Sequence, residues 1–130
     1  MSVPTDPLTS TVLTATCSGD LDAVTSGRTA GRLGELFIHV RDVATSIAAR
    51  GYGGGVLLVV AAEEPPESQI VANAVRALVR GLAREYAPDA VRINAVVGAA
   101  TPDPGALLDF LAGPAATILT GALFDLRDRS

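Results

Sequence analysis

The sequence predicts an α/β protein of three layers, with a parallel sheet of about four strands joined by crossover helices. Short apolar or β-branched runs alternate with longer segments of helical periodicity, which indicates repeated strand–helix–strand units. The run at 56–61 is apolar throughout, as in a strand buried on both faces of a parallel sheet. No linker divides the 130 residues, so we expect a loose lead-in at 1–10 and a single domain at 11–130.

The individual elements follow from periodicity and from their start and stop residues. Strands are predicted at residues 11–16, 56–61 and 91–97 and within 118–126. Helices are predicted at residues 29–50, 67–86 and 104–111, where apolar residues recur every three or four positions. Gly51 stops the first helix, and Pro65 and Pro66 precede the second. We expect Ile70, Val75 and Leu82 to point inward from the second helix.

Composition excludes several classes of protein. A formal net charge of −4 argues against a surface that tracks nucleic-acid phosphates, and no apolar run approaches the roughly 20 residues of a membrane span. One cysteine, Cys17, excludes an internal disulfide, and one histidine, His39, excludes a multi-histidine metal site. All 10 basic residues are arginine, which excludes lysine chemistry. Without a signal-like start, we expect a cytoplasmic protein.

One phrase in the second half is similar to a known family. Leu82-Ala83-Arg84-Glu85-Tyr86-Ala87-Pro88, followed by Val91-Arg92-Ile93-Asn94-Ala95-Val96, resembles the short-chain dehydrogenase/reductase (SDR) family. There a helix ends in L-A-x-E-Y/F-A-P, and the next strand reads I-R-V-N-x-V-x-P-G. The segments 54–59 and 110–125 resemble its serine-bearing strand and its C-terminal segment. The resemblance covers roughly residues 30–126 and implies the C-terminal half of a Rossmann-like fold, in a truncated and degenerate family member.

The resemblance also implies that the family's catalytic positions are replaced. Its spacing assigns the tyrosine and lysine to Ser68 and Ala72, the serine to about Ala62, and the assisting asparagine to about Arg32. A phenol delivers the proton and an ammonium lowers its pKa, and serine and alanine cannot perform these roles. The glycines at 51–55 follow a helix and precede a strand, which is the wrong context for a dinucleotide-binding turn. We therefore expect no catalytic residue of the family, no nicotinamide cofactor and no metal.

The long helices of the resembled family suggest a function for this chain. They pack against the same pair from a neighbouring subunit, and here they correspond to 29–50 and 67–86. We expect these interface residues: Phe37, Val40, Val43, Ile47, Val71, Val75, Leu78 and Val79. The leading interpretation is a non-catalytic SDR-like protein that self-associates or acts as an accessory or regulatory subunit. It would form a homodimer or a heteromer with a full-length SDR-like or other enzyme subunit, with no nucleic-acid or membrane partner.

Two alternatives use the crevice at the carboxyl ends of the strands. One is a small non-redox enzyme of isomerase or cyclase type, with Glu63 and Glu64 as an acid–base pair helped by His39 or Cys17. The other is a small-molecule binding module in the same crevice. Asn94 is interpreted as a structural hydrogen-bonding residue. A basic stripe on the second helix either meets an acidic partner or is a solvated face; it consists of Arg76, Arg80 and Arg84.

Overall fold

Three layers make up the fold, with a parallel sheet between two helical layers. A computed structural model of the whole chain describes residues 3–17, 26–62, 68–98, 105–114, 117 and 119–126. The sheet has the order β1-β2-β3-β4, with all pairs parallel. The strands are β1 (Ser10–Cys17), β2 (Gly54–Ala62), β3 (Val91–Gly98) and β4 (Leu123–Asp125). The helices are α2 (Arg28–Ala49), α3 (Ser68–Tyr86), the 3-10 turn η1 (Ala87–Asp89) and α4 (Gly105–Ala112).

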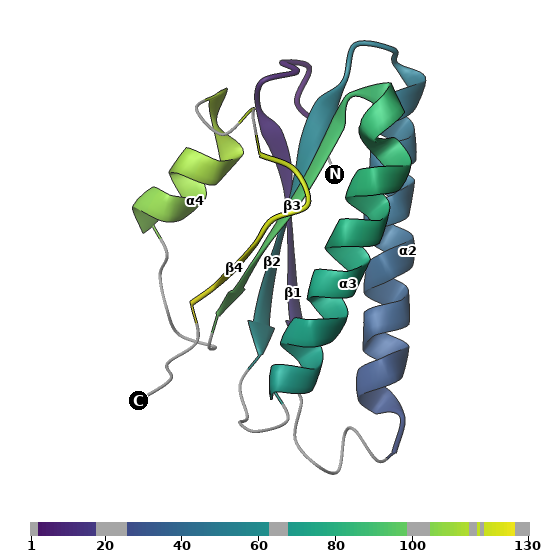
Figure 1. Cartoon of the computed structure of the whole chain (residues 1–130), viewed down its shortest axis with the longest axis vertical. Coiled ribbons are helices and arrows are strands. Elements are labelled where there is room, and N and C mark those ends of the chain that lie inside the picture. Colours follow the sequence, from purple (N-terminus) through teal and green to yellow (C-terminus); the bar gives the residue numbers. More distant parts are fainter. Residues whose placement is uncertain are drawn as a thin grey trace.

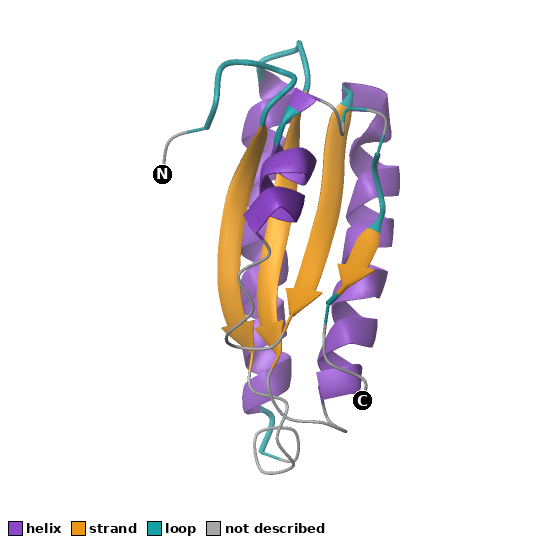
Figure 2. Cartoon of the chain, turned by 90° about the vertical axis from the view of Figure 1, so that its left-hand side faces the viewer, coloured by secondary structure: helices purple, strands orange, loops and turns teal. Residues whose placement is uncertain are grey.

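The helices cover opposite faces of the sheet. Figure 1 shows α2 and α3 side by side on one face and α4 on the other, and Figure 2 shows the strands running in one direction. Strand β2 is central, since it pairs with β1 and β3 along nearly its whole length. The predicted α/β fold with three layers is therefore confirmed. None of the helices in the described part of the chain is long and apolar enough to cross a membrane.

Strand β2 is buried on both of its faces, which explains the continuous apolar run that predicted it. Leu57 and Leu58 are 1% and 0% exposed, although successive side chains of a strand point to opposite faces. Leu58 lies in the large core between the sheet and α2 and α3, together with Val40 and Ile93. Leu57 lies in a small core under α4, together with Leu111 and few other buried side chains. Because both faces are buried, apolar and polar residues do not alternate along β2, and a search for that alternation would not have identified this strand.

The described part of the lead-in, from Val3 to Thr9, is irregular in backbone and attached to the amino end of the sheet. Arg50, after α2, donates from Nη1 to the Pro4 carbonyl at 2.6 Å. Arg92 of β3 donates from Nη2 to the Pro7 carbonyl at 3.0 Å. Val3 packs against the large core, and Ser10 already belongs to β1. Two arginine side chains thus fix a segment whose prolines and polar residues predict no regular structure.

Glycine at position 55 makes one of these contacts possible. The register places Gly55 between Ser10 of β1 and Arg92 of β3. A Cβ atom at Gly55 would overlap the Ser10 hydroxyl and would lie 3.0 Å from Nη2 of Arg92. The missing side chain therefore leaves the space in which the Arg92 guanidinium reaches the lead-in.

Strand β4 is shorter than the predicted segment, and ahead of it the side chain of Asn94 adds bonds to the backbone bonds with β3. Asn94 donates from Nδ2 to the Leu119 carbonyl at 2.9 Å, and its Oδ1 accepts from the Ala122 amide at 3.1 Å. Gly121 has a φ of 74°, which breaks the extended chain before β4 begins at Leu123. The structural role predicted for Asn94 is confirmed, and this side chain is 4% exposed.

Candidate functional site

The candidate site is the edge where the strands end and the helices begin. In a parallel sheet the carboxyl ends of the strands meet the amino ends of the crossover helices, and ligands of open α/β folds bind there. Strands β1, β2 and β3 end at Cys17, Ala62 and Gly98 on this edge, and α3 begins at Ser68. Figure 1 shows this edge at the lower end of the molecule.

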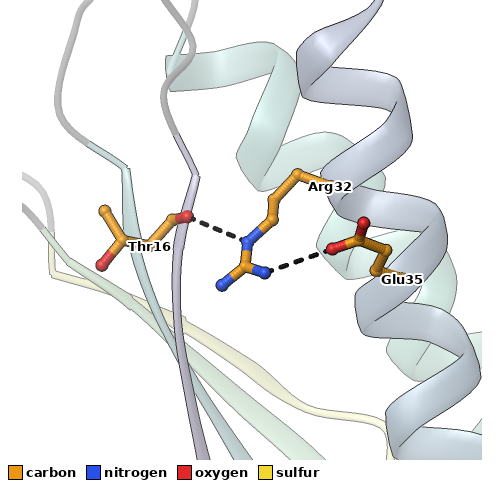
Figure 3. A network of polar contacts seen from close by, with 3 residues as sticks. All are labelled: Thr16, Arg32 and Glu35. Carbon is orange, nitrogen blue, oxygen red and sulfur yellow. Dashed lines mark hydrogen bonds and ion pairs between the residues drawn. The ribbon is translucent and has the colours of Figure 1, made fainter.

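Arg32 is a polar side chain of α2 that bonds to this edge. Its Nε donates to the Thr16 carbonyl at 3.4 Å, and its Nη1 lies 3.3 Å from Oε2 of Glu35, one turn along α2 (Figure 3). The side chains of Arg32 and Glu35 are 50% and 74% exposed, so this ion pair contributes little stability. A guanidinium group has only hydrogen-bond donors, so Arg32 can bind or orient an anion at this edge.

Two of the positions implied by the resemblance lie inside the large core. Ala62 at the end of β2 is 2% exposed, and Ala72 in the second turn of α3 is 0% exposed. Both side chains are methyl groups packed among apolar neighbours. They offer neither a hydroxyl nor an ammonium to the edge, so no proton transfer can be assigned to them. Ser68 is the first residue of α3, and its side chain lies outside the described part.

The residues behind the alternative functions are only partly placed. Glu63 and Glu64 lie outside the described residues, as does the side chain of Cys17. His39 is exposed on α2, where no described residue forms a hydrogen bond or ion pair with it. The described segments bring together no three side chains of the histidine, cysteine, aspartate and glutamate type that hold metals.

Most of the predicted interface residues prove to be core residues. Val40, Ile47, Val71, Val75 and Val79 are 0–1% exposed and face the sheet, so they cannot reach a second chain. This part of the prediction is wrong, because the most apolar stripe of each helix is used by the sheet first. The remaining three are Val43 and Leu78, which are half-buried, and Phe37, which is 36% exposed.

Other apolar side chains take the outer positions of the helix pair. Ile38 of α2 is 51% exposed and Ile70 of α3 is 48% exposed, and the inward orientation predicted for Ile70 is wrong. Arg41 lies over the Phe37 ring, 5.6 Å from its centre. Sequence reasoning missed Ile38. The signal that could have found it is a second stripe at helical spacing, in which Gly31 and Gly34 precede Ile38 by seven and four residues.

Glycine and alanine also occupy these outer positions, although packing within the single chain does not require residues so small. On α3 the spacing places Ile70, Ala74, Ala77 and Gly81 in one stripe. A Cβ atom added to Gly34 or Gly81 would meet nothing within 4 Å. Glycine inside a helix costs roughly 1 kcal/mol relative to alanine, and no contact within the described chain accounts for that cost at either position. We name Gly31, Gly34, Ile38, Ile70, Ala74, Ala77 and Gly81 the outer stripe.

Comparisons with known proteins agree with the resemblance. A family model described as "Short chain dehydrogenase-like protein" matches residues 38–126. The fold is similar to that of BdcA from E. coli, with a TM-score of 0.66 and 21% identity over 88% of this chain and 59% of that one. It is also similar to a short-chain type dehydrogenase/reductase from Mycobacterium marinum, with a TM-score of 0.66 and 18% identity over 88% and 61%.

A third similar structure is the acetoin dehydrogenase YohF from Salmonella typhimurium, with a TM-score of 0.66 and 19% identity over 89% and 62% of the two chains. The chain thus spans about three fifths of the length of these structures. No curated protein matches the chain in sequence. Because the family model covers more than half of the sequence, the chain belongs to the short-chain dehydrogenase-like family.

Proposed function

We propose that this chain is a non-catalytic SDR-like subunit that acts by association, with the outer stripe of α2 and α3 placed against a second copy of the chain. The observation that carries the proposal is the occupancy of the implied serine and lysine positions by Ala62 and Ala72, both buried as methyl groups. The whole sequence contains no lysine that could take over from another position.

The chemistry of hydride transfer supports the first half of the proposal. Carbonyl reduction by this family needs a proton donor whose pKa is lowered by a nearby cation. The two phenols of the sequence lie far from the carboxyl edge. Tyr86 is at the opposite end of α3, where its hydroxyl is 2.7 Å from that of Thr45, and Tyr52 precedes β2 beside the Arg50 guanidinium. Neither phenol can serve the edge.

The helix pair supports the second half. Ile38 and Ile70 are about half exposed on neighbouring helices, and unused glycines lie in the same stripes. Small residues let two helix backbones approach closely, and apolar side chains at the contact supply the association energy. A second copy is the favoured partner because one stripe placed against itself about a two-fold axis gives a closed assembly.

The test is the oligomeric state of the full chain by sedimentation velocity across the micromolar range. We expect a dimer that Ile38→Glu or Ile70→Glu converts to monomer. Phe110→Glu is the matched control, since Phe110 is 49% exposed on α4 at the opposite face, and we expect it to leave the dimer intact. A wild-type monomer, or equal dissociation by all three variants, would contradict association through the outer stripe.

Catalytic incompetence has its own test. Titration with NADH and NADPH, followed by nicotinamide fluorescence, should give no saturable enhancement with the purified chain. Turnover of either coenzyme with a panel of aldehydes and ketones would overturn the non-catalytic assignment whatever the oligomeric state. If the chain is a monomer and binds no coenzyme, the non-catalytic half of the proposal stands. Association should then be tested in a mixture with a complete SDR subunit.

A further inference from the structure

Three arginines of α3 stand apart from the other polar side chains of the chain. Arg76, Arg80 and Arg84 are exposed, and none of them forms a hydrogen bond or ion pair with a residue in the described part. The chain as a whole is acidic, with a formal net charge of −4. Unpaired cations are therefore concentrated on one helix of a protein that has an excess of carboxylates elsewhere.

Two of these arginines border a cavity. It lies between α3 and the segment that leads into β4, has a volume of about 320 Å³, and is lined by Arg76, Arg80, Gly121 and Leu123. Arg84, one turn further along α3, is outside the lining. Among the described residues no carboxylate lines the cavity, so no described side chain of its wall neutralises the two guanidinium groups.

The wall opposite the arginines is fixed by backbone and side-chain bonds. The Gly121 amide donates to the Ile93 carbonyl at 2.7 Å, and the Ile93 amide donates to Oγ1 of Thr120 at 3.1 Å. Asn94 holds both ends of the same segment, as described above. The folded chain therefore holds this side of the cavity in place, and a ligand need not order it.

We propose that this cavity binds an oxyanion, a phosphate or carboxylate group, between Arg76 and Arg80. Guanidinium groups recognise both anions through paired, charge-assisted hydrogen bonds. Residues four apart lie on the same side of a helix, so both guanidinium groups can reach one oxyanion. The site is distinct from the carboxyl edge and does not depend on the chain's being non-catalytic or dimeric.

The experiment is isothermal titration calorimetry with inorganic phosphate and, separately, with succinate at constant ionic strength. The two titrations distinguish a phosphate site from a carboxylate site. Arg76→Gln and Arg80→Gln test the lining residues, and Arg84→Gln is the matched control, since it removes the same charge from the same helix outside the cavity. Thermal unfolding of each variant confirms that the fold is retained.

We expect saturable binding of at least one anion, with a dissociation constant that rises about tenfold or more in Arg76→Gln and Arg80→Gln. Arg84→Gln should change it less than about threefold, through the lost long-range charge alone. No saturable binding of either anion at millimolar concentration would overturn the proposal. Equal weakening by all three variants would also overturn it, because the effect would then come from net charge and not from the cavity.

Discussion

The two faces of the sheet are buried to different degrees. On one face α2 and α3 enclose a continuous core that extends from Leu13 of β1 to Leu123 of β4. On the other face α4 covers a small core around Leu57, while Val12, the register partner of Leu57 on β1, is 41% exposed. The difference indicates that the fold is stabilised mainly from the α2–α3 side. On the α4 side the described contacts are the small apolar core and the two hydrogen bonds of Asn94.

Adjacent leucines of β2 give the sharpest test of this comparison. Leu58→Ala should destabilise the protein by about 3–5 kcal/mol, since it leaves a cavity in a core enclosed on all sides. Leu57→Ala should cost about 2–3 kcal/mol, because the single helix above it can move into the space. Urea denaturation of both variants measures the difference, and an equal or larger cost for Leu57→Ala would break the comparison.

Asn94 tests whether polar bonds hold the α4 side. Asn94→Ala removes one donor and one acceptor from half-buried backbone partners, and we expect a loss of about 2–3 kcal/mol. The control is Asn73→Ala, since Asn73 is exposed on α3 and accepts a hydrogen bond from Gln69 at 2.9 Å. This substitution should lower the free energy of unfolding by less than about 0.5 kcal/mol. Similar costs for the two asparagines would show that the segment 119–122 is held by packing instead.

The two arginines at the amino end of the sheet sharpen the comparison further. Arg50→Met should cost about 1–2 kcal/mol, because it removes bonds to Pro4 and Gly53 together. Arg92→Met should be closer to neutral. Partial burial lowers the pKa of Arg92, because the charged form is less favourable in the folded chain than in the unfolded chain. This cost to the stability persists at every pH at which Arg92 is protonated, and it ends only in strong alkali. Thermal denaturation at pH 7 compares them, and a larger loss for Arg92→Met would contradict this account.

The smallest expected effects concern the glycines of the outer stripe, and they are opposite for stability and for association. Gly34→Ala and Gly81→Ala should each raise the stability of a single chain by roughly 0.5–1 kcal/mol, since both sites are open and helical. The same variants should weaken association, because the added methyl groups separate the helices. Chemical denaturation at low concentration measures the first effect and sedimentation the second. Stabilisation without any change in association would argue against a helix contact at the glycines.

The sequence was sufficient for the arrangement of the elements but not for which helix stripe faces the sheet. Strand β2 and the two long helices lie within two residues of their predicted bounds, because runs and periodicities reflect burial directly. Ile70 was placed inward because helical spacing shows that a stripe exists without showing what covers it. The lead-in contacts and the short β4 were not predictable, since both depend on side chains from distant segments, Arg50, Arg92 and Asn94.

The candidate edge was predicted less completely. Reasoning from the residues and the resemblance identified the positions Ala62, Ala72 and Arg32, and the structure describes their surroundings. The cavity beside Arg76 and Arg80 was not foreseen beyond a basic stripe. Its other wall comes from Gly121 and Leu123, about 40 residues further along the chain, and no local pattern links the two segments.

The parallel course of α2 and α3 has a consequence for the electric field around the molecule. Both helices follow strands of the same direction, so their amino ends lie at the same edge of the sheet. Each helix carries roughly half a positive elementary charge at that end, and the two macrodipoles add instead of cancelling. The two helix ends and the Arg32 guanidinium therefore all favour an anion at this edge, and their contribution weakens as salt shortens the Debye length.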